Sequence, residues 1–310
     1  MNGVLLVNMG GPESLKEVKG FLSKMFKDPF ILPFPTLIRN LLSFIISTTR
    51  YKKSWKKYEL IGGTPIISGT QKTVRSLQEK LRDKYKVRMA FSYSSPLIED
   101  SLLAFKKEGI TNITVIPLYP QASFTTTSSV IAEVEKVSLQ EKELNIKFVK
   151  EFYRHERFVG FWSEIIADHI IYKKHTQPFL LFSAHSIPKY LADKGDTYPT
   201  GIEQSAKLIA QNIGVEYDYA YQSGMARGEW LTPDVKVRLK ALAEAGTKEI
   251  IIIPISFVNE NLETLYDIDR EIIPYAKNEL MIESISRVKI PEANEMFIQL
   301  LADLVKNNLD

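Results

Sequence analysis

A group of acidic side chains follows one of the most apolar stretches of the chain. Ile250 to Val258 is a run of β-branched and aromatic residues, which is typical of a strand buried on both faces of a parallel sheet. The acidic residues that follow are Glu260, Glu263, Asp267, Asp269 and Glu271. Glu263, Asp267 and Glu271 share the spacing i, i+4, i+8, so on a helix they form one row. Such a row beyond a strand end can bind and pass on a divalent cation; a solvated helix face is the alternative.

One histidine is placed for chemistry. His185 comes just after a predicted buried strand, Phe179 to Ser183, on a turn of small residues. His155, His169 and His175 have charged neighbours in the sequence, so we expect them on the surface. An imidazole at a strand end can accept a proton or bind a metal. A purely structural histidine is the alternative, but the acidic row at another strand end favours catalysis.

Composition and missing motifs exclude several classes of protein. The chain has no cysteine, which removes disulfides, thiolate metal sites, cysteine nucleophiles and thiolate-bound iron–sulfur clusters. There is no G-x-S-x-G, Walker A or G-x-G-x-x-G motif. The net charge of +3 and the lack of a basic stripe argue against nucleic acid as a partner. What remains suits a cation and a large, flat, apolar ligand better than acyl or phosphoryl transfer.

The N-terminal part carries a possible membrane contact. Met1 leads directly into a strand at Val4, with no signal peptide and no apolar run of spanning length, so we expect a cytoplasmic protein, peripheral to the inner face of the membrane. Apolar residues recur at helical spacing from Phe34 to Ile46, and a basic, aromatic segment follows from Arg50 to Lys57. This pattern fits interfacial membrane contact through residues 30–57. A core-facing helix followed by a solvated basic face fits it equally well.

Strands alternate with helices along the chain, which predicts an α/β fold with parallel sheets. Two pairs of segments are also alike: residues 4–12 parallel 180–188, and residues 107–118 parallel 244–255. Met9 and His185 then occupy the same place, three residues before a proline. We therefore predict two related lobes, residues 1–150 (with a membrane-lip segment, 26–57) and 151–310, the final helix packing back on the first lobe.

The chain resembles the ferrochelatase family over nearly its whole length. The motifs that carry the resemblance are L-V-N-M-G-G-P-E (6–13), Y-x-x-I-G-G-x-P (58–65), L-Y-P-Q (118–121), F-S-A-H-S-I-P (182–188), G-D-x-Y-P (195–199), Q-S-x-x-x-x-x-x-W-L-x-P (222–233) and F-V-x-E-x-L-E-T-L-Y-D-I-D (257–269). Together they are specific, although no single one would be.

The resemblance implies two Rossmann-like lobes with parallel four-stranded sheets and flanking helices. It implies an enzyme, a lyase that inserts ferrous iron into protoporphyrin IX at the end of haem synthesis, with Fe2+ as substrate and no permanently bound cofactor. His185 and Glu263 would be catalytic, and Asp267 and Glu271 would join them as metal-contacting residues. Three further residues would face the porphyrin: Met9, Tyr93 and Trp230.

The sequence departs from the family pattern at three places. Asn261 stands where many members have a histidine, the 58–65 turn is one small residue shorter, and Glu59-Leu60 replaces a basic pair, so propionate contacts do not transfer there. The alternatives are a coproporphyrin ferrochelatase, a cobalt chelatase for a corrinoid precursor, which ranks lower, and a two-lobed protein that holds haem or a metal without catalysis.

Overall fold

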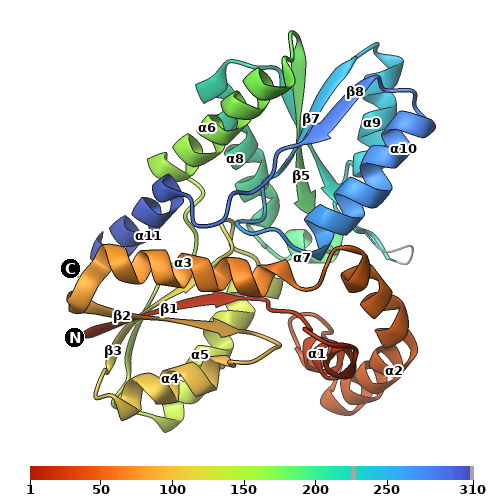
Figure 1. Cartoon of the computed structure of the whole chain (residues 1–310). Helices are drawn as coiled ribbons and strands as arrows, with labels where there is room; N and C mark the ends of the chain where they lie inside the picture. The colour runs from red at the N-terminus through yellow and green to blue at the C-terminus, as the bar shows by residue number, and fades with distance from the viewer. Residues whose placement is uncertain (225–227, 308–310) are drawn as a thin grey trace. The chain divides into compact units, whose positions relative to one another are not determined.

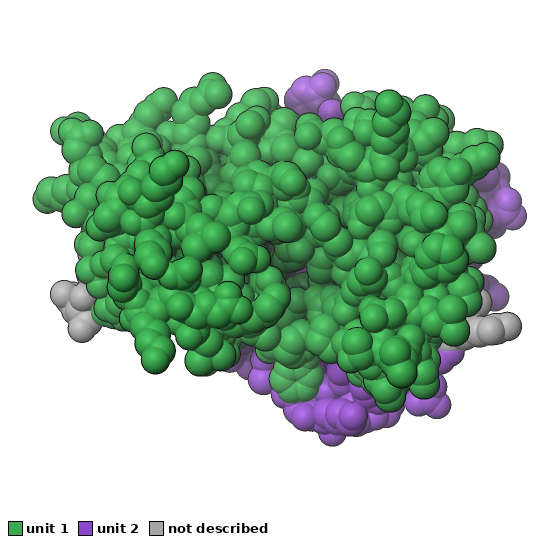
Figure 2. Space-filling model, turned by 90° about the horizontal axis from the view of Figure 1, so that it is seen from below, with its two compact units in different colours: residues 1–119, 123–151, 292–310 green, residues 120–122, 152–291 purple. Residues whose placement is uncertain are grey.

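The computed structural model describes residues 1–224 and 228–307, which form two compact units. Unit 1 comprises Met1–Tyr119, Ser123–Glu151 and Glu292–Asp310, and unit 2 comprises Pro120–Ala122 and Phe152–Pro291 (Figures 1 and 2). The chain therefore crosses between the units more than once. No helix in the described ranges has the length and apolar character needed to cross a membrane.

Unit 1 is built on a parallel sheet of four strands. They are β1 (Asn2–Asn8), β2 (Tyr85–Phe91), β3 (Asn112–Pro117) and β4 (Asn145–Phe148), in the order β2-β1-β3-β4. The helical segments are α1 (Leu15–Lys27), α2 (Thr36–Leu60), α3 (Pro65–Leu81), η1 (Arg82–Lys84), α4 (Ile98–Lys107), η2 (Phe124–Ser128), α5 (Ser129–Gln140) and α11 (Glu295–Asn307). Helices α4 and α5 cover one face of the sheet, and α3, with α11 packed against it, lies on the other (Figure 1).

Unit 2 repeats this plan. Its strands are β5 (Pro178–His185), β6 (Tyr217–Gln222), β7 (Glu249–Pro254) and β8 (Ser284–Arg287), all parallel, in the order β6-β5-β7-β8. The helical segments are α6 (Glu156–Lys173), α7 (Lys189–Asp193), α8 (Tyr198–Ile213), α9 (Val235–Glu244), η3 (Glu263–Ile272) and α10 (Ile273–Asn278). A core of aliphatic residues joins α9, η3 and α10 to one face of the sheet, while α6 and α8 pack together on the other (Figure 1).

The two sheets have the same topology, which confirms the predicted fold class and agrees with the internal repeat. β1 and β5 occupy equivalent places, as do β3 and β7. A wide helix with i→i+5 hydrogen bonds follows the third strand of each unit: η2 after β3 and η3 after β7. The apolar composition of the central strands explains the match, because parallel strands covered by helices on both faces are buried throughout.

Several element boundaries differ from the prediction. The sequence predicts a helix from Gln71, but α3 begins six residues earlier, at Pro65, because proline is favoured in the first helical turn after the glycine turn. Strand β7 ends at Pro254, short of the predicted end at Val258. Strand β8 was not predicted at all, since its four residues, S-I-S-R, carry too little apolar pattern.

Candidate functional site

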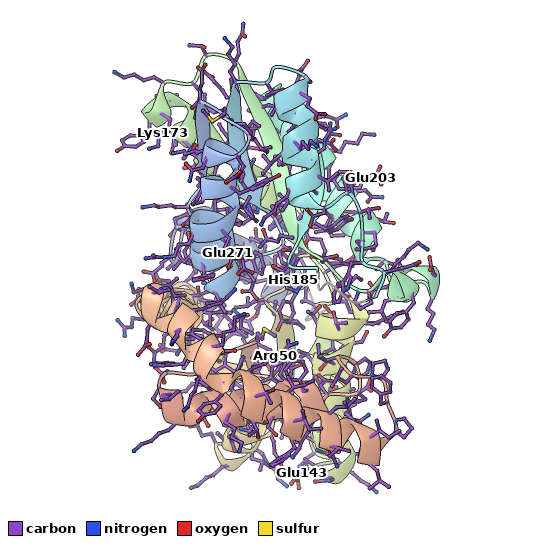
Figure 3. The ribbon with its side chains drawn as sticks, turned by 90° about the vertical axis from the view of Figure 1, so that its right-hand side faces the viewer. Arg50, Glu143, Lys173, His185, Glu203 and Glu271 are labelled. Atoms are coloured by element: carbon purple, nitrogen blue, oxygen red, sulfur yellow. The ribbon has the colours of Figure 1, made fainter. Side chains whose placement is uncertain are left out.

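Three neighbouring strands of unit 2 deliver polar groups to one edge of its sheet. β5 ends at His185, β6 ends at Gln222 and leads to Ser223, and β7 leads into the acidic segment and η3. Because these strands are parallel and adjacent in the order β6-β5-β7, their carboxyl ends meet at the same edge. Figure 3 shows His185 and Glu271 toward the same end of unit 2, with Lys173 at the opposite end. This is the edge at which open α/β sheets bind ligands.

Both backbone groups of His185, its N–H and its carbonyl, are hydrogen-bonded to side chains. Its N–H donates to Oγ of Ser256 at 3.3 Å, and its carbonyl accepts from the hydroxyl of Tyr198 at 2.9 Å. Burial raises the pKa of Tyr198, so this hydroxyl stays protonated and donates. The imidazole is half-buried, and in residues 1–224 and 228–307 it takes part in no hydrogen bond or ion pair. The backbone that carries the ring is thus fixed, and the imidazole is available to accept a proton or to bind a metal.

A buried polar pair joins β5 and β6 close to His185. Oγ of Ser183 donates to Oε1 of Gln222 at 2.6 Å, and both side chains are fully buried. Gln222 is also the ladder partner of His185. This pair ties β5 to β6 immediately before the site, so the strand end that carries His185 is rigid on the side of the sheet as well.

The acidic row lies on η3, so the predicted helix is present, but it is a wide helix with i→i+5 hydrogen bonds. Glu263 and Asp267 are half-buried and Glu271 is exposed, so the row runs from the protein interior to solvent. Asp267 accepts a hydrogen bond from the hydroxyl of Ser223 at 2.8 Å, which links the middle of the row to the end of β6. Wide helical turns of this kind are frequent at functional sites.

The start of η3 is capped by Asn261 and Thr264. The side-chain oxygen of Asn261 accepts from the N–H of Thr264 at 2.9 Å, and Oγ1 of Thr264 accepts from the N–H of Asn261 at 3.0 Å. Asn261 is buried, 5% exposed. In this chain the residue at the position where many relatives have a histidine is therefore part of a helix cap.

Two of the five acidic residues bind an arginine. Arg287 on β8 donates from Nε and Nη2 to the two carboxylate oxygens of Asp269 at 2.9 and 2.8 Å, and from Nη1 to Glu260 at 2.9 Å. Burial alone would lower the pKa of Arg287, but the hydrogen bonds and charges of the two carboxylates raise it. The five acids are therefore not equivalent: these two form an ion-pair network around a buried arginine.

The predicted metal-contacting residues come from two elements of the same edge: His185 from β5, and Glu263, Asp267 and Glu271 from η3. Within residues 1–224 and 228–307, no three or more histidine, aspartate or glutamate side chains are grouped so that they could hold an ion. The assignment of these residues to iron stays a prediction.

Trp230 is connected to the segment that follows His185. It forms an isolated antiparallel bridge with Pro188, and the N–H of Lys189 donates to the carbonyl of Glu229 at 2.9 Å. The indole is half-buried. Its predicted contact with the porphyrin is not tested by these contacts, but they place Trp230 beside the strand end that carries His185.

Met9 and Tyr93 lie at the corresponding edge of unit 1, after β1 and β2. The N–H of Tyr93 donates to the carbonyl of Met9 at 3.3 Å, and both side chains belong to a small apolar cluster with α1. The turn after Met9 requires glycine: Gly10 has a φ of +81°, and a Cβ on Gly11 would lie 2.4 Å from a methyl carbon of Thr64. The M-G-G-P motif therefore forms a fixed turn.

The hydroxyl of Tyr93 is engaged by a carboxylate. It donates to Asp28 at 2.7 Å, and Ser129 donates to the same oxygen at 2.5 Å. Burial, followed by the negative charge of Asp28, raises the pKa of Tyr93. Tyr93 is only 7% exposed, so within unit 1 it fixes the chain after α1. Its predicted contact with a ligand stays untested.

Helix α2 exposes its apolar residues and buries small polar ones. Ser43 and Ser47 are buried, and Oγ of Ser43 donates to the carbonyl of Ser23 on α1 at 2.8 Å. Leu37 and Leu41 are 85% and 60% exposed. Other exposed apolar residues of α2 are Ile38, Phe44 and Ile45, and Phe34 just before the helix is exposed too. Of the two interpretations of residues 34–46, the core-facing one is therefore wrong for these residues.

The other histidines are less exposed than predicted. The side chain of His175 is 4% exposed, with Nδ1 3.4 Å from a carboxylate oxygen of Glu249. His169 stacks on His175 with ring centroids 6.1 Å apart, and its Nε2 lies 2.8 Å from Oγ of Ser286. Their charged sequence neighbours misled the prediction, because two residues that contact them, Glu249 and Ser286, are distant in sequence. His155 is half-buried and accepts from the N–H of Arg157 at the start of α6.

Sequence reasoning also missed residues that support the site. Tyr198 and Gln222 lie within motifs that were singled out, G-D-x-Y-P and Q-S-x-x-x-x-x-x-W-L-x-P, so a signal for both was present. Ser223 lies in the second of these motifs too. Arg287 lay in the unpredicted strand β8 and had no signal beyond being a basic residue in an apolar setting.

Comparison with known sequences gives a consistent result. A family model described as Ferrochelatase matches residues 1–309. The ferrochelatase of Aquifex aeolicus is 40% identical over 311 residues, covering 99% of both chains. The ferrochelatase of Picosynechococcus is 36% identical over 320 residues, covering 99% of this chain and 83% of the relative.

Solved structures with the same fold are more distant in sequence. The sirohydrochlorin chelatase SirB from Bacillus subtilis subspecies spizizenii, in complex with cobalt, aligns with a TM-score of 0.56 at 15% identity, over 99% of this chain and 97% of that one. CbiX, described as the terminal enzyme of sirohaem biosynthesis in denitrifying bacteria, aligns with a TM-score of 0.51 at 11% identity, over the full length of both. At this level of identity the likeness supports the fold alone.

Proposed function

Because the chain belongs to the ferrochelatase family, we propose that it is a lyase that inserts ferrous iron into protoporphyrin IX, forming protohaem in the last step of haem synthesis. Membership of the family supports metal insertion into a porphyrin as the activity. The observation that supports the catalytic assignment is His185: a half-buried imidazole at the end of a central strand, with its backbone held on both sides, at the same sheet edge as the acidic row.

Metallation requires two protons to leave the macrocycle. Two pyrrole N–H bonds break, the four ring nitrogens bind Fe2+, and two protons are released. An imidazole can accept a proton near neutral pH, so His185 takes the first one. Glu263 takes the second, or relays protons outward along η3. In this assignment His185 and Glu263 are the catalytic residues.

The acidic row serves as the route for iron. Exposure increases along η3 from Glu263 and Asp267, which are half-buried, to Glu271, which is exposed. Ferrous iron accepts carboxylate and imidazole ligands, so it can pass from Glu271 inward toward His185. The porphyrin is assigned to Met9, Tyr93 and Trp230, from the resemblance to the family.

The exposed face of α2 supports peripheral membrane contact. Its apolar residues, together with the exposed basic residues Arg50, Lys52, Lys53 and Lys56 in the C-terminal half of the helix, suit a surface of anionic lipid. Arg50 is labelled on this helix in Figure 3. Anionic lipids are enriched in the cytoplasmic leaflet, so we place the protein in the cytoplasm, at the inner face of the membrane. An apolar porphyrin product makes such a contact useful.

The decisive experiment is anaerobic metallation followed by porphyrin absorption. Purified protein is mixed with Fe2+ and either protoporphyrin or coproporphyrin. We expect metallation of protoporphyrin at the higher kcat/KM; a preference for coproporphyrin would replace the proposed substrate and keep the chelatase. His185→Ala should abolish metallation and retain porphyrin binding, whereas the matched variant His155→Asn, which keeps an acceptor for the N–H of Arg157, should remain active. Tight porphyrin binding without metallation by the unaltered protein would make it a carrier.

A further inference from the structure

Arg287 binds the acidic segment at two separate points. It is 1% exposed at the side chain and lies at the end of the edge strand β8. Its contact with Glu260 holds the chain before η3, and its paired contact with Asp269 holds the second half of η3. We call these contacts the Arg287 clamp. Neither acid belongs to the row that we assign to iron.

Other bonds connect the clamp to the start of η3. Glu260 also accepts from the N–H of Ile290 at 2.9 Å, through the same oxygen that Arg287 binds. Its second oxygen accepts from Oγ1 of Thr264 at 2.5 Å, and Thr264 is part of the helix cap. The arginine, the carboxylate of Glu260 and the helix cap thus form one continuous network, from the edge strand β8 to the first turn of η3.

The position of Asp269 lets the clamp set the rotation of η3. Thr264, Ile268 and Ile272 form the buried stripe of this helix. Asp267 precedes Ile268 and Asp269 follows it, so the two carboxylates lie on opposite sides of the stripe. A bond that fixes Asp269 therefore also fixes the side to which Asp267 and the rest of the row point.

A wide helix depends on such a constraint. Helices with i→i+5 hydrogen bonds are rare and persist where the surrounding structure imposes them. Arg287 also offsets two negative charges in a segment that carries three more, which lowers the repulsion among them. The planar guanidinium reaches both oxygens of Asp269 and one of Glu260 at the same time, which the single ammonium of a lysine cannot do.

We propose that Arg287 is a positioning residue for iron delivery: by clamping Glu260 and Asp269 it holds η3 in the rotation that aligns Glu263, Asp267 and Glu271. The inference rests on the proposed function, because it needs this row to carry iron. It assigns no contact between Arg287 and either substrate. It predicts an effect on the use of iron that is separate from any effect on the porphyrin.

The test is Arg287→Lys, which keeps the charge and loses the planar fork. Its matched control is Arg238→Lys, the same change at an arginine of α9 that pairs with Asp218 on β6 in the same unit. The KM for Fe2+, the KM for porphyrin and kcat are measured under anaerobic conditions. Titration with Co2+ in the absence of porphyrin reports metal affinity independently of turnover.

We expect Arg287→Lys to raise the KM for Fe2+ by about tenfold and to weaken Co2+ binding by a similar factor, because a displaced row binds metal less well. The KM for porphyrin should stay within about twofold of the unaltered protein, and Arg238→Lys should change neither metal value. Equal changes in the KM for Fe2+ and the KM for porphyrin would overturn the proposal. It would also be overturned if both KM values stayed the same and kcat fell only by the fraction of protein that is unfolded.

A second variant decides the matter if Arg287→Lys does not fold. Asp269→Asn keeps one acceptor for Arg287 and leaves the arginine in place. It should raise the KM for Fe2+ in the same direction by a smaller factor, and an unchanged value would refute the clamp. The unaltered protein in the same assay separates the two hypotheses: if it does not metallate porphyrin, the proposed function fails; if it does and both variants keep its iron dependence, only the role of Arg287 fails.

Discussion

The hydroxyl of Tyr198 donates a hydrogen bond to the carbonyl oxygen of His185 at 2.9 Å. Tyr198 is the first residue of α8, whereas His185 is the last residue of β5. The bond therefore links the start of a helix to the strand end that carries the proposed base. It holds the carbonyl of His185 while Ser256 holds its N–H, and the direction of the imidazole depends on both bonds.

Tyr198→Phe should lower kcat by about tenfold, because it frees the backbone carbonyl of His185 without removing the imidazole. The carbonyl loses its buried partner, which should reduce the free energy of unfolding by about 1–2 kcal/mol. Steady-state metallation and urea unfolding measure the two effects. Tyr153→Phe is the control: it removes a buried hydroxyl that bonds Gln204 in the same unit, so it should reduce stability and leave kcat unchanged. Equal kcat values for the two variants would contradict the positioning role.

Asp267→Asn combined with Glu271→Gln should raise the KM for Fe2+ by about fivefold or more, because two carboxylates of the proposed path lose their charge. The KM for porphyrin should not change, since neither residue is assigned to it. Initial rates at varied Fe2+ measure the effect. Glu279→Gln, at an exposed acid that ends α10, is the control for a general loss of negative charge. An iron dependence equal to that of the unaltered protein would remove Asp267 and Glu271 from the path.

The fold could be predicted because its strongest signals are local. The central strands, such as Leu180 to Ala184 and Ile250 to Ile253, are continuous apolar runs that only a doubly covered parallel sheet buries fully. The spacing of apolar residues also predicts a helix from Glu156 to Lys173, and α6 has these limits. The short edge strand β8 was missed, because a partly covered strand of four residues carries little pattern.

The site could be predicted only as far as residue type and strand order determine it. The position of His185 at a strand end followed from the sequence, but its bonds to Tyr198 and Ser256 depend on tertiary packing. Which acidic residues form ion pairs and which do not depends on Arg287, whose strand was not predicted. Arg287 binds Asp269 and Glu260. The wide turns of η3 could not be foreseen either, because the same residues at the same spacing are compatible with an ordinary α-helix.

Leu37→Ser combined with Leu41→Ser should weaken binding to anionic vesicles by about tenfold or more, because each leucine loses its apolar contact with the lipid. Vesicles of phosphatidylglycerol and phosphatidylcholine are sedimented with the protein at low salt. The control is Leu103→Ser with Leu139→Ser, two exposed leucines on α4 and α5 of the same unit. Added salt should weaken binding through the basic residues of α2. If the unaltered protein does not sediment with these vesicles, the proposed membrane contact is wrong.

The free energy of unfolding should fall as the pH decreases from about 6.5 to about 4, owing to His169. Its pKa is lowered from 6.5 to about 4, first by burial and then by electrostatic repulsion from His175, Lys173 and Arg287. Between these values the unfolded chain binds a proton that the folded protein does not, so acid favours unfolding; above this range His169 has no effect. Because the ring is partly exposed, we expect a loss of about 1–2 kcal/mol, discounted for solvent screening.

His169→Gln isolates this contribution, because an amide can still bond Ser286 and does not titrate in this range. Urea unfolding between pH 4 and pH 7 should show a shallower pH dependence for the variant than for the unaltered protein, with the two curves separating as the pH decreases. His155→Asn, which removes a histidine at the other end of α6 and keeps an acceptor at its N-cap, is the control and should retain the steeper dependence. Parallel curves for His169→Gln and the unaltered protein would show that the acid sensitivity arises from other groups.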